Sequence, residues 1–114
     1  MKVLKFGGSS LADAERYLRV KDISIACHTD VGAAVVLSAP KGVTNALSLL
    51  CDEAASGKDY GELFAKLNMV LFGILDDLQN NVPNFSQVKL AEFIQYTLNE
   101  LNQHLEGFAL LRCA

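Results

Sequence analysis

The chain has 114 residues, of which 51% are hydrophobic and 20% charged. This length allows one domain at most, and the apolar fraction excludes a disordered chain, because disordered segments are polar and rich in charge. Ten lysines and arginines against thirteen aspartates and glutamates give a net charge of −3, which argues against binding to nucleic acid or to an anionic membrane.

The sequence contains neither a recognisable targeting segment nor a metal-binding pattern. Its N-terminal residues lack the long apolar stretch and the small-residue cleavage site of a secretory signal. The most apolar window, Leu67–Leu75, is much shorter than the roughly 20 residues of a membrane span, and it predicts a buried helix. The three cysteines are too widely spaced for a disulfide framework or a zinc site, so we expect reduced thiols in a cytoplasmic protein and no metal.

The first predicted element is a strand that leads into a helix. Lys2–Phe6 is short, apolar and β-prone, and it predicts a strand that is buried on both faces and stops at Gly7 and Gly8. In the helix that follows, Ser10 is the expected N-cap. Asp13 is expected in the first turn, where a negative charge is favourable beside the helix dipole.

A second predicted strand follows this helix. The helix is expected to extend to about Cys27 and to end before the turn residues Asp30–Gly32. Ala33–Ser38 is again apolar and predicts a second buried strand. Because a strand, a helix and a strand follow one another in so short a stretch, the pattern predicts a βαβ unit with two parallel strands.

The rest of the chain predicts helices only. One helix is expected to follow Thr44 as its N-cap and to close at Ser56–Asp59. A second carries an apolar stripe over Leu63–Leu78 and is expected to break at the proline-containing segment Asn80–Asn84. Both helices have the apolar periodicity that is typical of packed amphipathic helices.

The last predicted helix begins near Ser86 or Gln87 and is expected to end at Gly107, which leaves an apolar tail. Two strands followed by three helices make a helix-rich α/β unit with an incomplete parallel sheet, because parallel sheets are normally wider and covered on both faces. The narrow sheet and the uncapped tail predict a truncated chain. Exposed strand edges and the tail also predict a homo-oligomer, formed by pairing or by exchange of an element.

The turn after the first strand has the composition of an anion site. Gly7 and Gly8 let backbone N–H groups approach a ligand, and the N-terminus of a following helix adds partial positive charge. Lys5 precedes the glycines and can place an ammonium group on the same ligand. The pattern is neither the P-loop nor the dinucleotide fingerprint, and two alternatives stay open: a tight strand-to-helix turn, and a lysine that extends into solvent.

A second loop is expected at the same edge of the sheet. Ligands of parallel sheets bind at the carboxyl ends of the strands, where the second strand ends at Ser38 and Thr44 lies in the loop that follows. Their hydroxyl groups are candidate hydrogen-bond donors to a small polar substrate. The alternatives are that Ser38 bonds only to local backbone and that Thr44 serves only as a helix cap.

Two segments of this chain have the form of known motifs. Lys2–Ser10 reads KVLKFGGSS, and Val35–Asn45 reads VVLSAPKGVTN. They resemble, respectively, the N-terminal signature KFGG[ST]S and the second motif VLSA…GxTN of the aspartokinase family. The first segment, together with Asp13–Val20, is most similar to the bifunctional enzymes that fuse aspartokinase to homoserine dehydrogenase. The helices after Asn45 match only in their pattern.

The resemblance implies an amino-acid-kinase fold, a three-layer α/β sandwich, and transfer of the ATP γ-phosphoryl group to the β-carboxylate of aspartate. It implies ATP and Mg²⁺ as cofactors, with NADP added only if a dehydrogenase is present in the parent protein. Lys5 would be the catalytic lysine that stabilises the phosphates. Gly7, Gly8 and Ser9 would line the phosphates, and Ser38 and Thr44 would contact aspartate.

The resemblance also implies a division of the chain. Residues 1–114 would be the N-terminal fragment of the catalytic domain, with a phosphate- and substrate-loop unit over 1–45 and a helical part over 46–114. The family's nucleotide-binding half and regulatory domains are not found in the sequence, so the fragment alone is expected to be inactive. Two other functions remain: a non-enzymatic helical interaction module, and another amino-acid kinase that acts on glutamate or carbamate.

Overall fold

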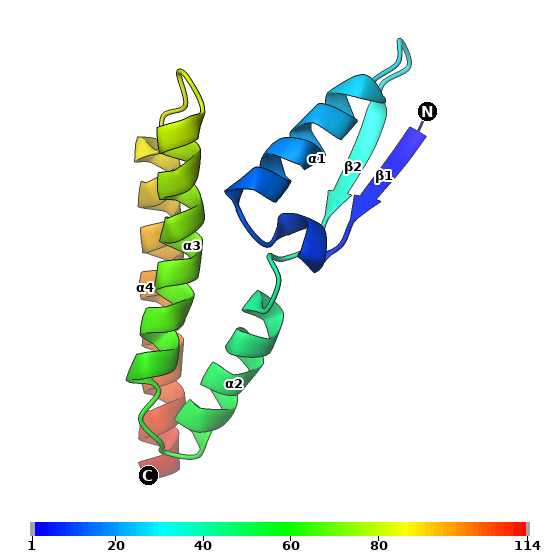
Figure 1. Ribbon diagram of the computed structural model, residues 1–114. Helices are drawn as coiled ribbons and strands as arrows, with labels where there is room; N and C mark the ends of the chain where they lie inside the picture. Colours follow the sequence, from blue (N-terminus) through cyan, green and yellow to red (C-terminus); the bar gives the residue numbers. More distant parts are fainter. Residues whose placement is uncertain (1, 114) are drawn as a thin grey trace. The chain divides into compact units, whose positions relative to one another are not determined.

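The structure, a computed structural model, describes residues 2–113. It divides into two compact units, one up to Thr44 and one from Asn45 onward. In chain order the elements are β1 (Lys2–Phe6), the 3-10 turn η1 (Gly8–Leu11), α1 (Ala14–Ala26), β2 (Ala33–Leu37), α2 (Val43–Ala55), α3 (Gly61–Asn81) and α4 (Val88–Cys113) (Figure 1). Within residues 2–113, two strands and four helices confirm the prediction of a helix-rich α/β chain. Among the described helices, none has the length and apolar character that a membrane span requires.

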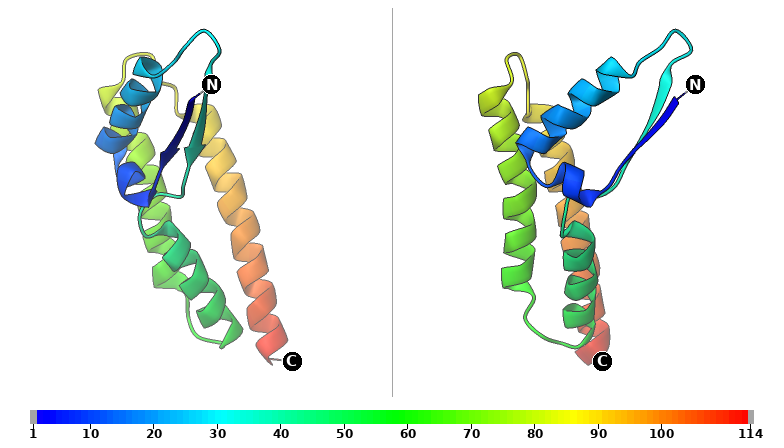
Figure 2. Two further views of the ribbon diagram at one scale, coloured as in Figure 1. Left: turned by 90° about the vertical axis from the view of Figure 1, so that its right-hand side faces the viewer. Right: turned by 45° about the vertical axis from the view of Figure 1, so that its right-hand side comes forward.

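The first unit is a βαβ arrangement, as the sequence predicts. β1 and β2 pair in parallel, with a register that runs from Lys2 opposite Ala33 to Phe6 opposite Leu37. The connecting helix α1 lies along one face of this two-stranded sheet (Figure 2). Its Val20 is buried, because it lies on the side of α1 that faces the sheet.

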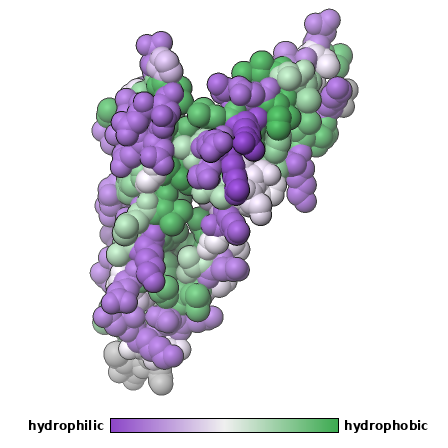
Figure 3. All heavy atoms as spheres, in the orientation of Figure 1, coloured by the Kyte–Doolittle hydropathy of each residue, from purple (hydrophilic) through white to green (hydrophobic). Residues whose placement is uncertain are grey.

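The prediction that both strands are buried on both faces is wrong for this chain. Val3 in β1 is 64% exposed, and Val36 in β2 is 48% exposed. The reason is that α1 covers one face of the sheet, while no other helix of this unit, within the described residues, covers the opposite face. Figure 3 shows hydrophobic surface over this unit.

The start of α1 differs from the prediction. Ser10 is not the N-cap, because it lies inside η1, where its backbone N–H donates to the carbonyl of Gly7 at 3.1 Å. Asp13 is the N-cap, and its carboxylate accepts from the backbone N–H of Arg16 at 2.9 Å. Aspartate is among the best N-caps since it satisfies a free N–H of the first turn. The acid in that turn is instead Glu15.

The start of α2 also differs, whereas its end is as predicted. α2 begins at Val43, so Thr44 lies in its first turn and is not the N-cap. The helix ends at Ala55, and Gly57 adopts a positive φ of 76°. The N–H of Gly57 donates to the Ala54 carbonyl and that of Lys58 to the Glu53 carbonyl, which is the Schellman arrangement that favours glycine.

The second unit is built on a pair of helices. α3 and α4 run side by side in opposite directions (Figures 1 and 2). α3 continues through Asn80 and Asn81, so its break begins at Val82, two residues later than predicted. Among the residues of this unit whose side chains the structure describes, the buried hydrophobic ones are Leu50, Ala54, Leu67, Leu75, Leu98 and Leu105.

Gly107 does not end the last helix. α4 passes through Gly107 and continues to Cys113, so the predicted tail is helical up to that residue, and Ala114 lies outside the described residues. A single glycine lowers helix propensity but is tolerated inside a long helix whose other residues favour it. The predicted start is correct to within one or two residues, since α4 begins at Val88.

Candidate functional site

The two loops that follow the strands leave from one edge of the sheet. The register aligns the last residues of β1 and β2, Phe6 and Leu37. Directly after β2, the backbone N–H of Ser38 donates to the carbonyl of Phe6 at 3.1 Å. The parallel pairing therefore continues to the beginning of both loops, and the segments that start at Gly7 and at Ser38 are neighbours.

Gly8 brings these loops into contact. A Cβ atom added at Gly8 would lie 3.1 Å from the carbonyl oxygen of Ala39 and 3.5 Å from the Cα of Lys41. At Gly7 an added Cβ would meet nothing within 4 Å. Gly8 is thus the residue whose missing side chain lets the first loop pass against the second, while the space around Gly7 is open to a ligand.

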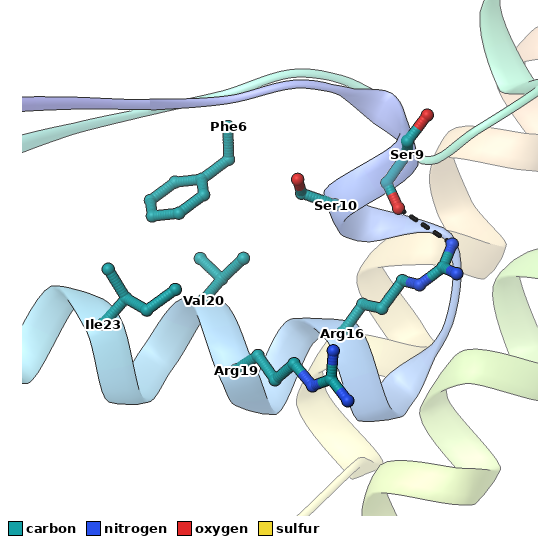
Figure 4. Close-up of a pocket in the computed structure, with 7 residues that line it drawn as sticks. All are labelled: Phe6, Ser9, Ser10, Arg16, Arg19, Val20 and Ile23. Carbon is teal, nitrogen blue, oxygen red and sulfur yellow. Dashed lines mark hydrogen bonds between the residues drawn. The ribbon is translucent and has the colours of Figure 1, made fainter.

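The turn that contains Ser9 is held by an arginine from α1. The guanidinium of Arg16 donates to the backbone carbonyl of Ser9 at 3.0 Å, as the dashed line in Figure 4 shows. The hydroxyl of Ser10 is directed toward the same pocket in that view. No sequence motif singles out Arg16. Its position on the first turn of the helix that follows the glycines is the signal that points to it.

Arg16 also lines a pocket between the sheet edge and α1. The pocket has a volume of about 280 Å³ and is lined by Phe6, Ser9, Ser10, Arg16, Arg19, Val20 and Ile23 (Figure 4). Phe6, Val20 and Ile23 form its apolar side. Arg19 pairs with Glu15 at 3.3 Å, an exposed i, i+4 ion pair of little energetic weight. The pocket therefore combines an apolar wall with two guanidinium groups.

Lys5 is not part of this pocket. Successive side chains of a strand point to opposite faces, and Phe6 faces Val20 and Ile23 of α1 (Figure 4). Lys5, the residue before Phe6, is therefore on the face of the sheet that α1 does not cover, and its side chain is exposed. Within residues 2–113 it forms no salt bridge, so its ammonium group is available to a ligand on that face.

Ser38 and Thr44 are both exposed at the second loop. Between them, Gly42 has a φ of 85°, and the N–H of Val43 donates to the Pro40 carbonyl at 3.0 Å. This turn carries the chain from β2 into α2. In the part of the chain that the structure describes, neither hydroxyl has a protein hydrogen-bond partner, so both groups are free to bind a ligand.

The titratable groups that could bind a metal do not gather at this edge. Among residues 2–113, no group of three or more His, Cys, Asp or Glu side chains is arranged to hold a metal ion. Tyr17, which follows Arg16 on α1, is partly buried, and this burial raises the pKa of its phenol. What the site offers is backbone N–H groups, hydroxyls and cationic side chains, which are ligands for anions.

Comparison with known proteins identifies relatives of this chain. No family model matches it. It is 32% identical over 112 residues to the bifunctional aspartokinase/homoserine dehydrogenase of Buchnera aphidicola, an alignment that covers 98% of the chain and 14% of the relative. It is 36% identical over 110 residues to the enzyme of the same name from Haemophilus influenzae, over 90% of the chain and 14% of that relative.

The fold is shared with a solved aspartokinase. Escherichia coli aspartokinase III, in complex with lysine and aspartate, superposes with a TM-score of 0.73 and 33% identity over 96% of this chain and 23% of its own. A second structure of that enzyme, in complex with aspartate and ADP, matches equally well. The α/β class and the resemblance to bifunctional aspartokinases are thereby confirmed. The chain spans about a seventh of the length of the curated relatives it matches and about a quarter of aspartokinase III.

Proposed function

We propose, on the premise that this chain is homologous to bifunctional aspartokinase/homoserine dehydrogenases over 14% of their length, that it forms part of an aspartate kinase. The reaction is transfer of the ATP γ-phosphoryl group to the β-carboxylate of aspartate, the first step of lysine, threonine and methionine biosynthesis. The observation that carries the proposal is the contact of Gly8 with Ala39 and Lys41. This contact joins the two loops that have the phosphate-binding and substrate-binding motifs.

The first loop is assigned to the phosphates. Backbone N–H groups at Gly7 and Gly8 approach the phosphoryl oxygens, because no side chain is in the way, and Ser9 adds a hydroxyl. Lys5 is the catalytic lysine, whose ammonium neutralises charge on the transferred group. Phosphoryl transfer depends mainly on positioning and on charge neutralisation, and both are functions that exposed groups at this edge can perform.

The second loop is assigned to aspartate. Ser38 and Thr44 have hydroxyls without a partner among the described residues, and a hydroxyl can donate to a carboxylate. Support for the nucleotide and the amino acid comes from aspartokinase III, which binds aspartate and ADP. We assign Mg²⁺ to the bound nucleotide, since the described residues provide no metal cluster of their own and Mg²⁺ is commonly held through substrate phosphates.

Several features belong to the parent enzyme. We assign the chain, residues 1–114, to the N-terminal part of the catalytic domain, with the loop unit over 1–45 and the helical part over 46–114. Because it corresponds to a small share of its relatives, it is inactive alone. The parent is a cytoplasmic homo-oligomer that binds neither nucleic acid nor membrane, and it uses NADP if it contains the dehydrogenase.

The test compares Lys5→Ala with Lys2→Ala in the complete enzyme that contains this chain. Both lysines are exposed and lie on β1, so the second variant controls for loss of charge from the strand. ADP release with ATP, Mg²⁺ and aspartate is expected to fall by about 10²–10³ in kcat for Lys5→Ala. It should stay within about twofold of wild type for Lys2→Ala, because surface substitutions away from a site have small effects.

The same assay separates the alternatives. A kinase that acts on glutamate or carbamate would release ADP with those substrates and not with aspartate. If Lys5→Ala leaves turnover unchanged, the catalytic assignment is wrong and the non-enzymatic interaction module gains support. ADP release by the 114-residue chain alone would contradict the inactivity that we propose for it.

A further inference from the structure

α4 has a row of exposed residues that its own unit does not use. The helix buries Leu98 and Leu105 on one side. Another side presents what we name the outer row, all of whose members are exposed: Phe93, Tyr96, Glu100, His104, Phe108 and Leu111. Successive members are three or four residues apart, so they share one side of the helix. Its ends, Phe93 and Leu111, are separated by five turns, or about 27 Å.

The C-terminal half of this row contains a groove. It is shallow, with a volume of about 560 Å³, and is lined by Gln103, His104, Gly107, Phe108, Leu110 and Leu111. Gly107 lies in the interior of α4, where glycine weakens a helix. A Cβ atom there would meet nothing within 4 Å. The packing of this chain therefore does not require glycine at 107, yet its missing side chain deepens the groove.

The outer row is symmetric about the level of Asn102. Glu100 and His104 are each two residues from it, Tyr96 and Phe108 six residues, and Phe93 and Leu111 nine. A second α4 laid antiparallel across this level would therefore place carboxylate against imidazole, aromatic ring against aromatic ring, and Phe93 against Leu111. An interface of this kind, in which one patch meets its own copy, is the usual basis of a two-fold dimer.

We propose that two copies of this chain associate through the outer row of α4, with the helices antiparallel and the dyad at the level of Asn102. Phe93 and Tyr96 of each copy enter the groove beside Gly107 of the other. The proposal does not depend on the proposed kinase function. It differs from pairing at strand edges, which the sequence suggests, because it uses α4 and no strand.

Charge decides the direction of the two helices. In the antiparallel arrangement Glu100 faces His104, and an imidazole has at least one N–H that can donate to a carboxylate. In a parallel arrangement Glu100 would face Glu100, which is unfavourable. Glu100 also raises the pKa of the Tyr96 phenol, so the two side chains lie near each other on the row.

The aromatic residues explain why the row should pair. Phe93 is 65% exposed and Leu111 75% exposed, and each would lose contact with water on association. Aromatic side chains that enter a pocket of the partner are the usual energetic centre of an interface. The groove is at the opposite end of the row from Phe93, so antiparallel pairing fills both grooves at once.

The first test measures the mass of the 114-residue chain by sedimentation equilibrium over a range of concentrations. The wild-type chain is expected to approach twice its mass of 12.4 kDa. Phe93→Glu is expected to remain a monomer. Met69→Glu on α3 is the matched control, since Met69 is similarly exposed at 74% but lies outside the row, and it should dimerise like wild type.

A variant at Gly107 separates pairing from folding. Gly107→Leu adds a side chain whose Cβ meets nothing within 4 Å among the described residues, and it improves helix propensity. We expect its melting temperature as a monomer to rise while the dimer is lost, because the side chain fills the groove. Dimerisation equal to wild type in this variant would overturn the proposal.

A charge exchange tests the antiparallel direction. Glu100→Lys places lysine opposite His104, and His104→Glu places two glutamates opposite each other, so each variant alone should dimerise at least tenfold more weakly than wild type. In an equimolar mixture, the heterodimer sets the new lysine of one chain against the new glutamate of the other and keeps one native Glu100–His104 pair. The mass measured for the equimolar mixture should therefore return to that of the wild-type dimer. A wild-type chain that stays monomeric at every concentration, or a mixture that does not recover, refutes this interface.

Discussion

Replacing Gly8 by alanine tests the contact on which the candidate site depends. The added Cβ would lie 3.1 Å from the Ala39 carbonyl oxygen and 3.5 Å from the Lys41 Cα. Both atoms belong to the backbone, so they cannot move aside as a flexible side chain would. Overpacking of this kind costs about 1–3 kcal/mol, because one of the two loops must shift by a few tenths of an ångström.

Gly7→Ala is the matched control for this substitution. Gly7 has a φ of −81° and a ψ of 177°, which alanine adopts without strain, and an added Cβ meets nothing within 4 Å. Both variants lose a glycine from the unfolded chain, which stabilises each by about 0.4–1 kcal/mol. That gain cancels in the comparison, so the difference in the free energy of unfolding between the variants should be about 1–3 kcal/mol, with Gly8→Ala the less stable.

The assay is urea unfolding of the 114-residue chain, followed by far-ultraviolet circular dichroism. The midpoint for Gly8→Ala should move to lower urea than wild type, and that for Gly7→Ala should stay or move to higher urea. If the slope m is unchanged, the midpoint shift reports stability alone. Equal midpoints for the two variants would refute the reasoning, since they would show that Gly8 does not hold the loops in contact.

Three further predictions concern the helices. Asp13→Ala should lower the free energy of unfolding by about 1 kcal/mol, because the first turn of α1 loses its cap. Asp13→Asn should retain most of that stability. Equal losses of stability for the two variants in urea unfolding would contradict the capping role of Asp13. Leu105→Ala should cost about 2–5 kcal/mol, since Leu105 is fully buried, whereas Met69→Ala at an exposed position should change stability by less than about 0.5 kcal/mol. For Tyr60, burial, Glu106 and Asp59 raise the pKa of the phenol, so the folded state holds this proton more tightly than the unfolded chain does. The resulting stability is present below the unfolded pKa of about 10. It is lost as the pH rises through the pKa of the folded state. Ultraviolet titration should show that Glu106→Gln moves the titration midpoint of Tyr60 back toward the unfolded pKa. An unmoved midpoint would exclude the Glu106 carboxylate as a cause of the raised pKa.

Local patterns were sufficient to predict most of the elements. Lys2–Phe6 is a strand because its apolar, β-prone run stops at two glycines, and α3 follows the apolar stripe over Leu63–Leu78. The turn at Gly57 was also predictable, because a glycine after a helix commonly takes the positive φ that closes it. Each of these signals acts within a few residues, so sequence alone contains it.

The errors arise where several residues compete for one role. Ser10 and Asp13 are both good caps, and η1 takes Ser10, which leaves Asp13 to cap α1. Gly107 resembles a helix end, but the residues that follow it still favour a helix. Thr44 precedes a helical pattern, yet the turn at Gly42 lets α2 begin at Val43, two residues before the predicted start. Local propensity does not decide between such options.

By itself, the sequence determined the parallel strand pair, the helices and the edge of the sheet at which the candidate site lies. These follow from hydrophobic periodicity, from glycine positions and from the rule that parallel strands end at one edge. Only the tertiary structure decided that Gly8 touches Ala39, that Arg16 holds the turn at Ser9, and that Lys5 is on the face that α1 does not cover. The first contact joins segments far apart in the chain. The other two depend on how α1 packs on the sheet, which no local pattern encodes.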